Sequence, residues 1–313
     1  MLRKLLVALS ATVVLAIGGF VAFLYLAPET FTRVVVEAGR SHAELTRKEI
    51  VLPDGLRYVY LEGGQGEPLL LLHGFGANKD AFVQIAPHLV KHYRLILPDH
   101  IGFGESSHPA DADYGPEAQA GRLHALLQAL GIRGKVHVGG NSMGGLIALH
   151  YGARFPDETA SLWLLDPAGV TSAPQTEFLK AVFSGPKNPL LIRNVDDLDY
   201  VVSQVASKPL YIPKPMLAVL AQERIANYTL EQKIAGQLFK DHTEQRVAGL
   251  ALPTLIVWGD EDRLLSPAGA DILHAMLPNS RVTLMKGIGH IPMIEDPAAT
   301  AADYLRFAAS LGH

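Results

Sequence analysis

Short apolar segments alternate with stretches of helical periodicity from residue 49 to the C-terminus, and this alternation limits the possible folds more than any other feature of the chain. Helices that connect buried strands in this way cover both faces of a mainly parallel sheet. We therefore expect an α/β fold with a mostly parallel central sheet and helices on both faces. The predicted strands are 56–61, 69–72, 95–97, 136–138, 162–165, 255–258 and 282–285, and the predicted helices are 79–91, 116–130, 143–155, 267–276 and 297–311.

One segment, 169–248, breaks the alternation. It is rich in apolar residues, it is interrupted by prolines, and it contains no clear strand–helix unit. Because the strand–helix pattern continues on both sides, we predict an inserted helical cap over 169–248, while 49–168 and 249–313 form the core. The alternative is a plain run of core helices.

The N-terminus carries an uncharged run of 23 residues, from Leu5 to Ala27. A helix of that length rises about 35 Å, enough to cross a hydrocarbon layer of about 30 Å. We predict an uncleaved transmembrane anchor over 1–27; the alternatives are a cleaved signal peptide and a buried soluble helix. Arg3 and Lys4 favour a cytoplasmic tail, which would place the rest of the chain on the other side of the membrane.

Residues 28–48 follow as a predicted juxtamembrane helix with an apolar stripe on one face. Within the anchor, the small residues Ala8, Thr12, Ala16 and Gly19 share one helix face, a pattern that lets two membrane helices approach closely. This stripe would allow a homodimer through the transmembrane and juxtamembrane helices. The alternative is that Ala and Gly are simply common in membrane helices.

Composition removes several classes of function. The net charge is −4, so the chain lacks the basic excess of a nucleic-acid-binding protein. It contains no cysteine, which excludes disulfides, Cys-ligated metal and a Cys nucleophile.

The strongest local motif is Gly140-Asn141-Ser142-Met143-Gly144, between a predicted strand and a predicted helix. This is the context of a nucleophile elbow, whose strained turn exposes the serine and requires small residues two positions away on either side. Gly140 and Gly144 meet that requirement. The turn also places the start of a helix under the serine, where backbone N–H groups can stabilise an oxyanion.

With this motif, the chain resembles the α/β-hydrolase superfamily, and the likeness covers most of 50–313. Further motifs match in order: His73-Gly74-Phe75-Gly76, the loop 99–106 (DHIGFGES), Trp258-Gly259-Asp260-Glu261-Asp262 and Gly287-Ile288-Gly289-His290. The resemblance implies a triad of Ser142, Asp262 and His290. It implies an oxyanion hole from the backbone N–H groups of Phe75 and Met143, with Gly74 in the oxyanion loop. His73 and His100 are interpreted as structural.

The chemistry explains why each member is needed. A serine hydroxyl is a weak nucleophile at neutral pH, an imidazole can take its proton, and a carboxylate orients that imidazole. No metal or organic cofactor is required. The acid is the least certain assignment, because Asp260 lies two residues before Asp262 and because Asp166 ends an earlier strand, where some family members place their acid.

The anchor and an exported domain add a narrower likeness, to membrane-anchored bacterial lipases and phospholipases A. We therefore predict a serine esterase of the bacterial inner membrane, with its catalytic domain in the periplasm, that cleaves lipid or phospholipid and releases fatty acid. Two alternatives are another Ser-triad hydrolase, such as a C–C bond hydrolase or a perhydrolase, and a non-catalytic binding module on the same fold. A serine nucleophile excludes the branches of the fold that use Asp.

Overall fold

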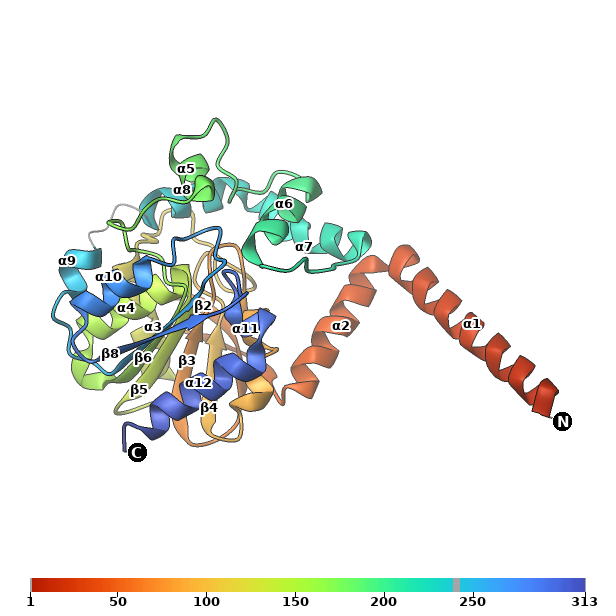
Figure 1. Cartoon of the computed structure of the whole chain (residues 1–313), viewed down its shortest axis with the longest axis horizontal. Helices are drawn as coiled ribbons and strands as arrows, with labels where there is room; N and C mark the ends of the chain where they lie inside the picture. The colour runs from red at the N-terminus through yellow and green to blue at the C-terminus, as the bar shows by residue number, and fades with distance from the viewer. Residues whose placement is uncertain (1, 239–242, 313) are drawn as a thin grey trace.

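The computed structural model describes residues 2–238 and 243–312, without the side chains of residues 2–11, 14 and 16. Its centre is a twisted sheet of eight strands in the order β1-β2-β4-β3-β5-β6-β7-β8 (Figure 1). The pairs β1–β2 and β2–β4 are antiparallel, and the other five pairs are parallel. The predicted α/β fold is thus confirmed. The strands are β1 (Thr46–Val51), β2 (Arg57–Gly63), β3 (Glu67–Leu72), β4 (Tyr93–Pro98), β5 (Val136–Asn141), β6 (Thr159–Leu165), β7 (Thr254–Gly259) and β8 (Ser280–Met285).

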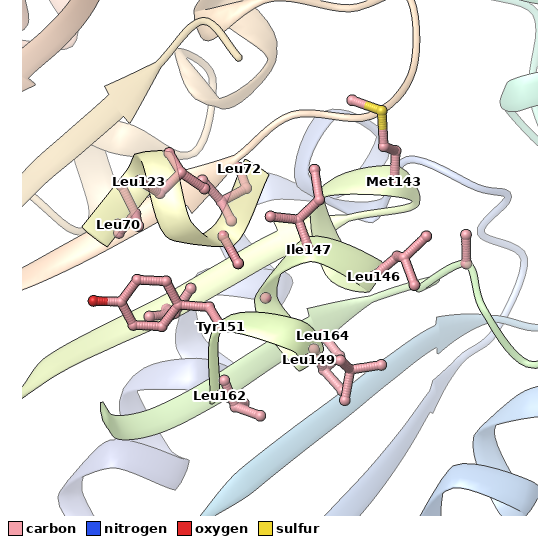
Figure 2. Packing of buried hydrophobic residues seen from close by; sticks show 14 of the residues in the cluster. Leu70, Leu72, Leu123, Met143, Leu146, Ile147, Leu149, Tyr151, Leu162 and Leu164 are labelled. Carbon is pink, nitrogen blue, oxygen red and sulfur yellow. The ribbon is translucent and has the colours of Figure 1, made fainter. Parts of the chain in front are cut away.

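Two apolar clusters, one on each face, hold helices against the sheet. Successive strand residues point to opposite faces, so Leu70 and Leu72 belong to one cluster while Leu69 and Leu71 belong to the other. Figure 2 shows the first cluster, where Ile147 and its neighbours on α4 (Met143–Arg154) pack onto strand leucines. That face is also covered by α3 (Pro116–Ala129) and α10 (Gly269–Met276). The other face is covered by α11 (Pro292–Glu295), α12 (Pro297–Ala309) and two short 3-10 helices, η1 (Lys79–Phe82) and η2 (Ala86–His88). A further 3-10 helix, η3 (Pro156–Glu158), precedes β6.

The segment between β6 and β7 contains helices and, among its described residues, no strand. Figure 1 shows most of these helices gathered over one end of the sheet. They are α5 (Glu177–Ser184), α6 (Val195–Val205), α7 (Lys214–Ala226), α8 (Tyr228–Leu238) and α9 (Thr243–Val247). The predicted cap over 169–248 also includes 239–242, which lie outside the described residues.

The N-terminal region forms two helices, α1 (Leu2–Leu26) and α2 (Pro28–His42), which meet at a sharp bend. In Figure 1, α1 projects away from the body, while α2 lies alongside the body and contacts α7. Within the described part of the chain, no one helix has the length and hydropathy of a membrane span. Only the bent pair of Ile17–Leu26 and Pro28–His42, which turns by 113°, meets both criteria, and only when the two are taken together.

Two predicted helices were wrong, one in where it ends and the other in its type. The helix predicted over 28–48 ends at His42, because Glu44 adopts a left-handed conformation (φ 56°) and Thr46–Val51 then pairs with β2 as an edge strand. The helix predicted over 79–91 is instead η1 and η2. Pro87 lies within η2 and lacks the N–H that a continuous α-helix would need there.

Candidate active site

Ser142 lies on the turn between β5 and α4, at the carboxyl end of the central strands. Its backbone is strained, with φ 55° and ψ −117°. A Cβ at Gly140 would lie 2.3 Å from the Gly144 backbone, and one at Gly144 would lie 2.0 Å from the Leu72 carbonyl oxygen. Only glycine fits at either position, so the two glycines permit the tight turn that raises the serine above the sheet.

The loop after β3 lies directly over this serine. A Cβ at Gly74 would be 3.3 Å from the Ser142 Cβ. His73 fixes this loop from below, since its Nδ1 contacts the Gly74 carbonyl at 2.8 Å and its Nε2 accepts from the His100 N–H at 3.0 Å. Burial lowers the pKa of His73 to about 4, which keeps the imidazole neutral in this role. The loop that carries Phe75 thus borders Ser142, and Phe75 and Met143 both line the cavity into which Ser142 opens.

His290 lies in the loop that follows β8. Its Nδ1 is 2.8 Å from Asp262 Oδ2, and both side chains are buried. The backbone of His290 is tied on two sides, because its N–H donates to the Val205 carbonyl at 2.7 Å and its own carbonyl accepts from Asn141 Nδ2 at 2.9 Å. The second bond links the loop of the imidazole to the residue before the serine.

The structure separates the three candidate acids. Asp262 contacts the imidazole, and its carboxylate also accepts from Trp258 Nε1 at 3.1 Å and from the Leu264 and Leu265 amides at 2.8 and 3.0 Å. Four hydrogen-bond donors thus surround one carboxylate and fix its orientation. Asp260 instead accepts from the Gly287 N–H, which serves the turn and not the imidazole.

Asp166 is the third carboxyl and lies beside this pair. It is fully buried at the end of β6, and its Oδ1 accepts from the Gly259 N–H at 2.9 Å. Burial and the negative charge of Asp262 raise the pKa of Asp166 well above its usual range. Ligand atoms of Asp166, Asp262 and His290 lie within 4.8 Å of one another, a spacing that could suit a cation. The contact of His290 with Asp262 and the hydrogen bond from the Gly259 N–H to Asp166 account for the positions of these three side chains.

A cavity of about 380 Å³ opens from the serine and lies between the core and the predicted cap. Ser142, His290, Gly74, Phe75 and Met143 line its floor. Its other walls are mainly apolar side chains from the segment between β6 and β7. These include Phe178, Leu179, Val182, Leu198, Val201, Val202, Leu210, Ile212 and Leu220.

Sequence reasoning did not identify two groups that touch this site. Arg224, on α7, also lines the cavity and pairs with Glu231 on α8, and the Val205 carbonyl holds the backbone of His290. Neither residue stands in a motif. Both lie far in the sequence from the site residues beside them: Val205 from His290, and Arg224 from Ser142, with which it lines the cavity. No local sequence signal could have revealed them.

Comparison with known proteins gives a consistent family. Residues 67–297 match the model of the α/β-hydrolase fold family. The chain is 44% identical over 285 residues to Lipase 1 of Psychrobacter immobilis, covering 90% of this chain and 89% of that one. It is 45% identical over 281 residues to Lipase 3 of Moraxella sp. (strain TA144), covering 88% and 89%.

Among solved structures, the chain resembles that of a membrane phospholipase A described as a bacterial virulence factor. The TM-score is 0.87 at 34% identity, and the match covers 99% of each chain. The lipase relatives confirm the predicted enzyme class, a carboxylic ester hydrolase. The predicted resemblance is likewise confirmed, and the chain belongs to the α/β-hydrolase family.

Proposed function

We propose that the protein is a membrane-anchored lipase or phospholipase A that cleaves carboxylic ester bonds of lipids through a Ser142–His290–Asp262 triad. The observation that carries the proposal is the 2.8 Å contact of His290 with Asp262, in a buried pair whose imidazole lines the same apolar cavity as Ser142. A base oriented by a carboxylate, beside a serine on a strained elbow, is the arrangement that acyl transfer needs.

In the proposed reaction, Ser142 Oγ attacks the ester carbonyl carbon while His290 Nε2 takes the hydroxyl proton. Asp262 stabilises the imidazolium that forms. The amides of Phe75 and Met143 donate to the oxyanion, each contributing about 3–4 kcal/mol of transition-state stabilisation. The imidazolium then protonates the leaving alcohol, and the acyl-enzyme forms. Water attacks the acyl-enzyme in the same way, which releases the fatty acid and restores the serine.

The cavity supports a lipid substrate. Its walls are mainly apolar, and each buried CH₂ of an acyl chain contributes about 0.8 kcal/mol to binding. The relatives named as lipases and the structural relative named as a membrane phospholipase A support the same substrate class.

Membrane attachment is a further part of the proposal. Several described apolar side chains of α1 are exposed, among them Leu15, Ile17, Phe20 and Leu26. A lipid layer would cover these side chains, and Arg3 and Lys4 would keep the preceding tail in the cytoplasm. We accordingly propose a bacterial inner-membrane protein with its catalytic domain in the periplasm. A homodimer through α1 and α2 belongs to the same proposal; the side chains of Ala8 and Ala16, part of its small-residue stripe, lie outside the described residues.

Release of free fatty acid from phospholipid vesicles and from emulsified glycerides by the purified full chain tests the substrate. We expect Ser142→Ala to abolish release, while Ser184→Ala, at an exposed position of α5, retains it. Turnover of short soluble esters without turnover of long-chain lipids would contradict the lipid assignment. Hydrolysis of diketones tests the C–C hydrolase alternative, and acyl transfer to hydrogen peroxide tests the perhydrolase alternative. Failure of a fluorophosphonate to label Ser142 would favour the binding module.

Cell fractionation tests the anchor. We expect the full chain to sediment with membranes and to resist salt extraction, and a chain lacking residues 1–27 to be released. Crosslinking of the two forms in membranes shows whether self-association depends on the same segment. Equal recovery of both forms from the soluble fraction would contradict the proposed anchor.

A further inference from the structure

Arg224 is a buried cation in the otherwise mainly apolar wall of the substrate cavity. Its side chain is 9% exposed, and that of its partner Glu231 is 4% exposed. The guanidinium donates to Glu231 through Nε at 3.1 Å and through Nη2 at 2.8 Å, and Nη2 also donates to the Leu190 carbonyl at 2.6 Å. Two partners from the segment between β6 and β7, Glu231 and the Leu190 carbonyl, therefore fix the position of this guanidinium.

The other side of the guanidinium lies on the oxyanion loop of the core. Arg224 Cζ is 5.7 Å from the centroid of the Phe75 ring, within the range of a cation–π contact. The next residue, Gly76, has φ +67°, and a Cβ there would lie 2.2 Å from Arg224 Cζ. Arg224 thus touches the backbone immediately after the amide that we assign to the oxyanion hole.

Phe75 is held from a second direction as well. Its ring meets that of Phe103, from the loop after β4, edge to face at 5.5 Å and 80°. The ring is thus held by an aromatic contact from the core and a cation from α7. The contacts at the Phe75 ring and at the Gly76 backbone together restrict how far this stretch of the loop, and with it the Phe75 N–H, can move.

We propose that Arg224 is a positioning residue that holds the oxyanion loop, so that the helices over the cavity complete the oxyanion hole. This inference rests on the proposed function, since it assumes acyl transfer at Ser142. It goes further by assigning a role in transition-state stabilisation to a side chain outside the triad and its motifs.

A competing role for Arg224 would be direct binding of an anionic lipid headgroup. Its surroundings argue against that role. Its charge is already balanced by Glu231, and a second carboxyl, that of Glu223, lines the adjoining cavity of about 360 Å³ with both residues. A phosphate entering there would meet two carboxylates and one guanidinium. Direct binding of a headgroup by Arg224 would overturn the proposal.

The test compares Arg224→Lys with Arg193→Lys in the full chain. Arg193 also lies over an aromatic ring, that of Tyr228 at 5.1 Å, but it is exposed and is not among the residues that line the cavity. Lysine keeps the charge and loses the planar fork. Displacing one oxyanion donor should lower kcat on a short soluble ester by about tenfold or more. We expect KM to change less than about twofold, and Arg193→Lys to behave as the wild type.

Binding of an alkyl boronic acid gives a readout that does not depend on turnover, because its tetrahedral adduct with Ser142 occupies the oxyanion hole. We expect Arg224→Lys to weaken this binding by a factor similar to its loss in kcat/KM. Phe75→Leu should cause a comparable loss, and the two substitutions combined should cost less than the product of the single effects. If Arg224→Lys does not fold, Glu231→Gln tests the same link, because it weakens the hold on the guanidinium.

Three outcomes overturn the proposal. The first is unchanged kcat and unchanged boronate affinity in a folded Arg224→Lys. The second is a rise in KM for anionic phospholipid with kcat unchanged, which indicates headgroup binding. The third is that the effects of the Arg224 and Phe75 substitutions simply multiply. Failure of the lipid assignment is distinguishable, because it shows in the wild type as hydrolysis of soluble ester without hydrolysis of lipid. If the wild type has no Ser142-dependent activity at all, both proposals are wrong.

Discussion

Asn141 Nδ2 donates a hydrogen bond of 2.9 Å to the backbone carbonyl of His290, and so joins the nucleophile turn to the loop of the base. The same amide group donates to the Leu165 carbonyl at 3.1 Å, at the end of the neighbouring strand β6. One buried side chain thus connects three chain segments that must be in register for Ser142 and His290 to share the cavity.

Asn141→Ala should therefore affect both stability and rate. It removes the Asn141 donor from the buried His290 carbonyl, while the Leu165 carbonyl keeps the Ser142 N–H, which donates to it at 3.0 Å. The lost hydrogen bonds cost about 1–3 kcal/mol of unfolding free energy. We expect kcat to fall about tenfold or more, because the base loop loses a positional constraint. Urea unfolding and ester kinetics measure the two effects. Asn279→Ala is the matched control, since Asn279 Nδ2 donates to the Ala251 carbonyl at an exposed position; equal effects of both variants would contradict the prediction.

Substitution of the three carboxyls should rank them by role. Asp262→Asn keeps the shape of the side chain but removes the charge opposite His290 Nδ1, and we expect kcat to fall by about 10³–10⁴-fold. Asp260→Asn changes the same turn without touching the imidazole and should stay within a few-fold of the wild type.

Asp166→Asn is the more discriminating variant. Burial and the charge of Asp262 raise the pKa of Asp166 and so favour its neutral carboxyl, with which an amide is close to isosteric. We expect only a few-fold loss of kcat, measured on the same soluble ester. A loss as large as that of Asp262→Asn would show that Asp166 carries the negative charge of the site.

How far the sequence predicts this site depends on how local each interaction is. The nucleophile elbow is contiguous, since strand, glycine spacing and helix start lie within one short segment, so Ser142 could be located directly. Asp262 and Asp260 are both plausible in the sequence, and only the tertiary placement of the imidazole distinguishes them. Arg224 and Phe75 are about 150 residues apart, and their contact depends on how α7 lies over the core.

The fold shows the same limit. The central strand β7 is buried along its whole length, and its continuous apolar run, 255–258, predicts a strand. The edge strand β1 (Thr46–Val51) is polar and exposed along almost its whole length, so it has neither an apolar run nor a two-residue alternation. Its strand conformation comes from pairing with β2, which no local pattern encodes.

Glu105 should make stability depend on pH in the acidic range. Burial alone would raise its pKa, but hydrogen bonds from Arg47 and Lys79, with their positive charges, outweigh it and lower the pKa to about 2. Because the folded-state pKa lies below the ordinary value of 4.5, the stabilisation is complete above pH 4.5 and is lost as the pH falls toward 2.

Glu105→Gln isolates this contribution. We expect the difference in unfolding free energy between the wild type and Glu105→Gln to stay constant above about pH 5 and to shrink as the pH is lowered through the range between the two pKa values. Denaturant titrations at several pH values measure it. A difference that stays constant down to pH 3 would contradict the lowered pKa. The size of the effect is limited by solvent screening, since the Glu105 side chain is 44% exposed.

Breaking the ion pair of Lys79 with Asp99 should lower the free energy of unfolding far more than the loss of the Glu105 charge, because both side chains are almost completely buried. Asp99 accepts from Lys79 Nζ at 2.8 Å, from the Lys79 backbone N–H at 2.7 Å and from the Glu105 N–H at 2.8 Å, and it thereby fixes the loop between β4 and α3.

Lys79→Met removes the cation and leaves a buried carboxylate without its counter-charge, which costs about 3–5 kcal/mol of unfolding free energy. Lys48→Met is the matched control, because Lys48 is half exposed and its pair with Glu62 is worth about 0–1 kcal/mol. Thermal and urea unfolding compare the two variants, and a loss below about 1 kcal/mol in Lys79→Met would mean that the amide donors alone satisfy the Asp99 charge.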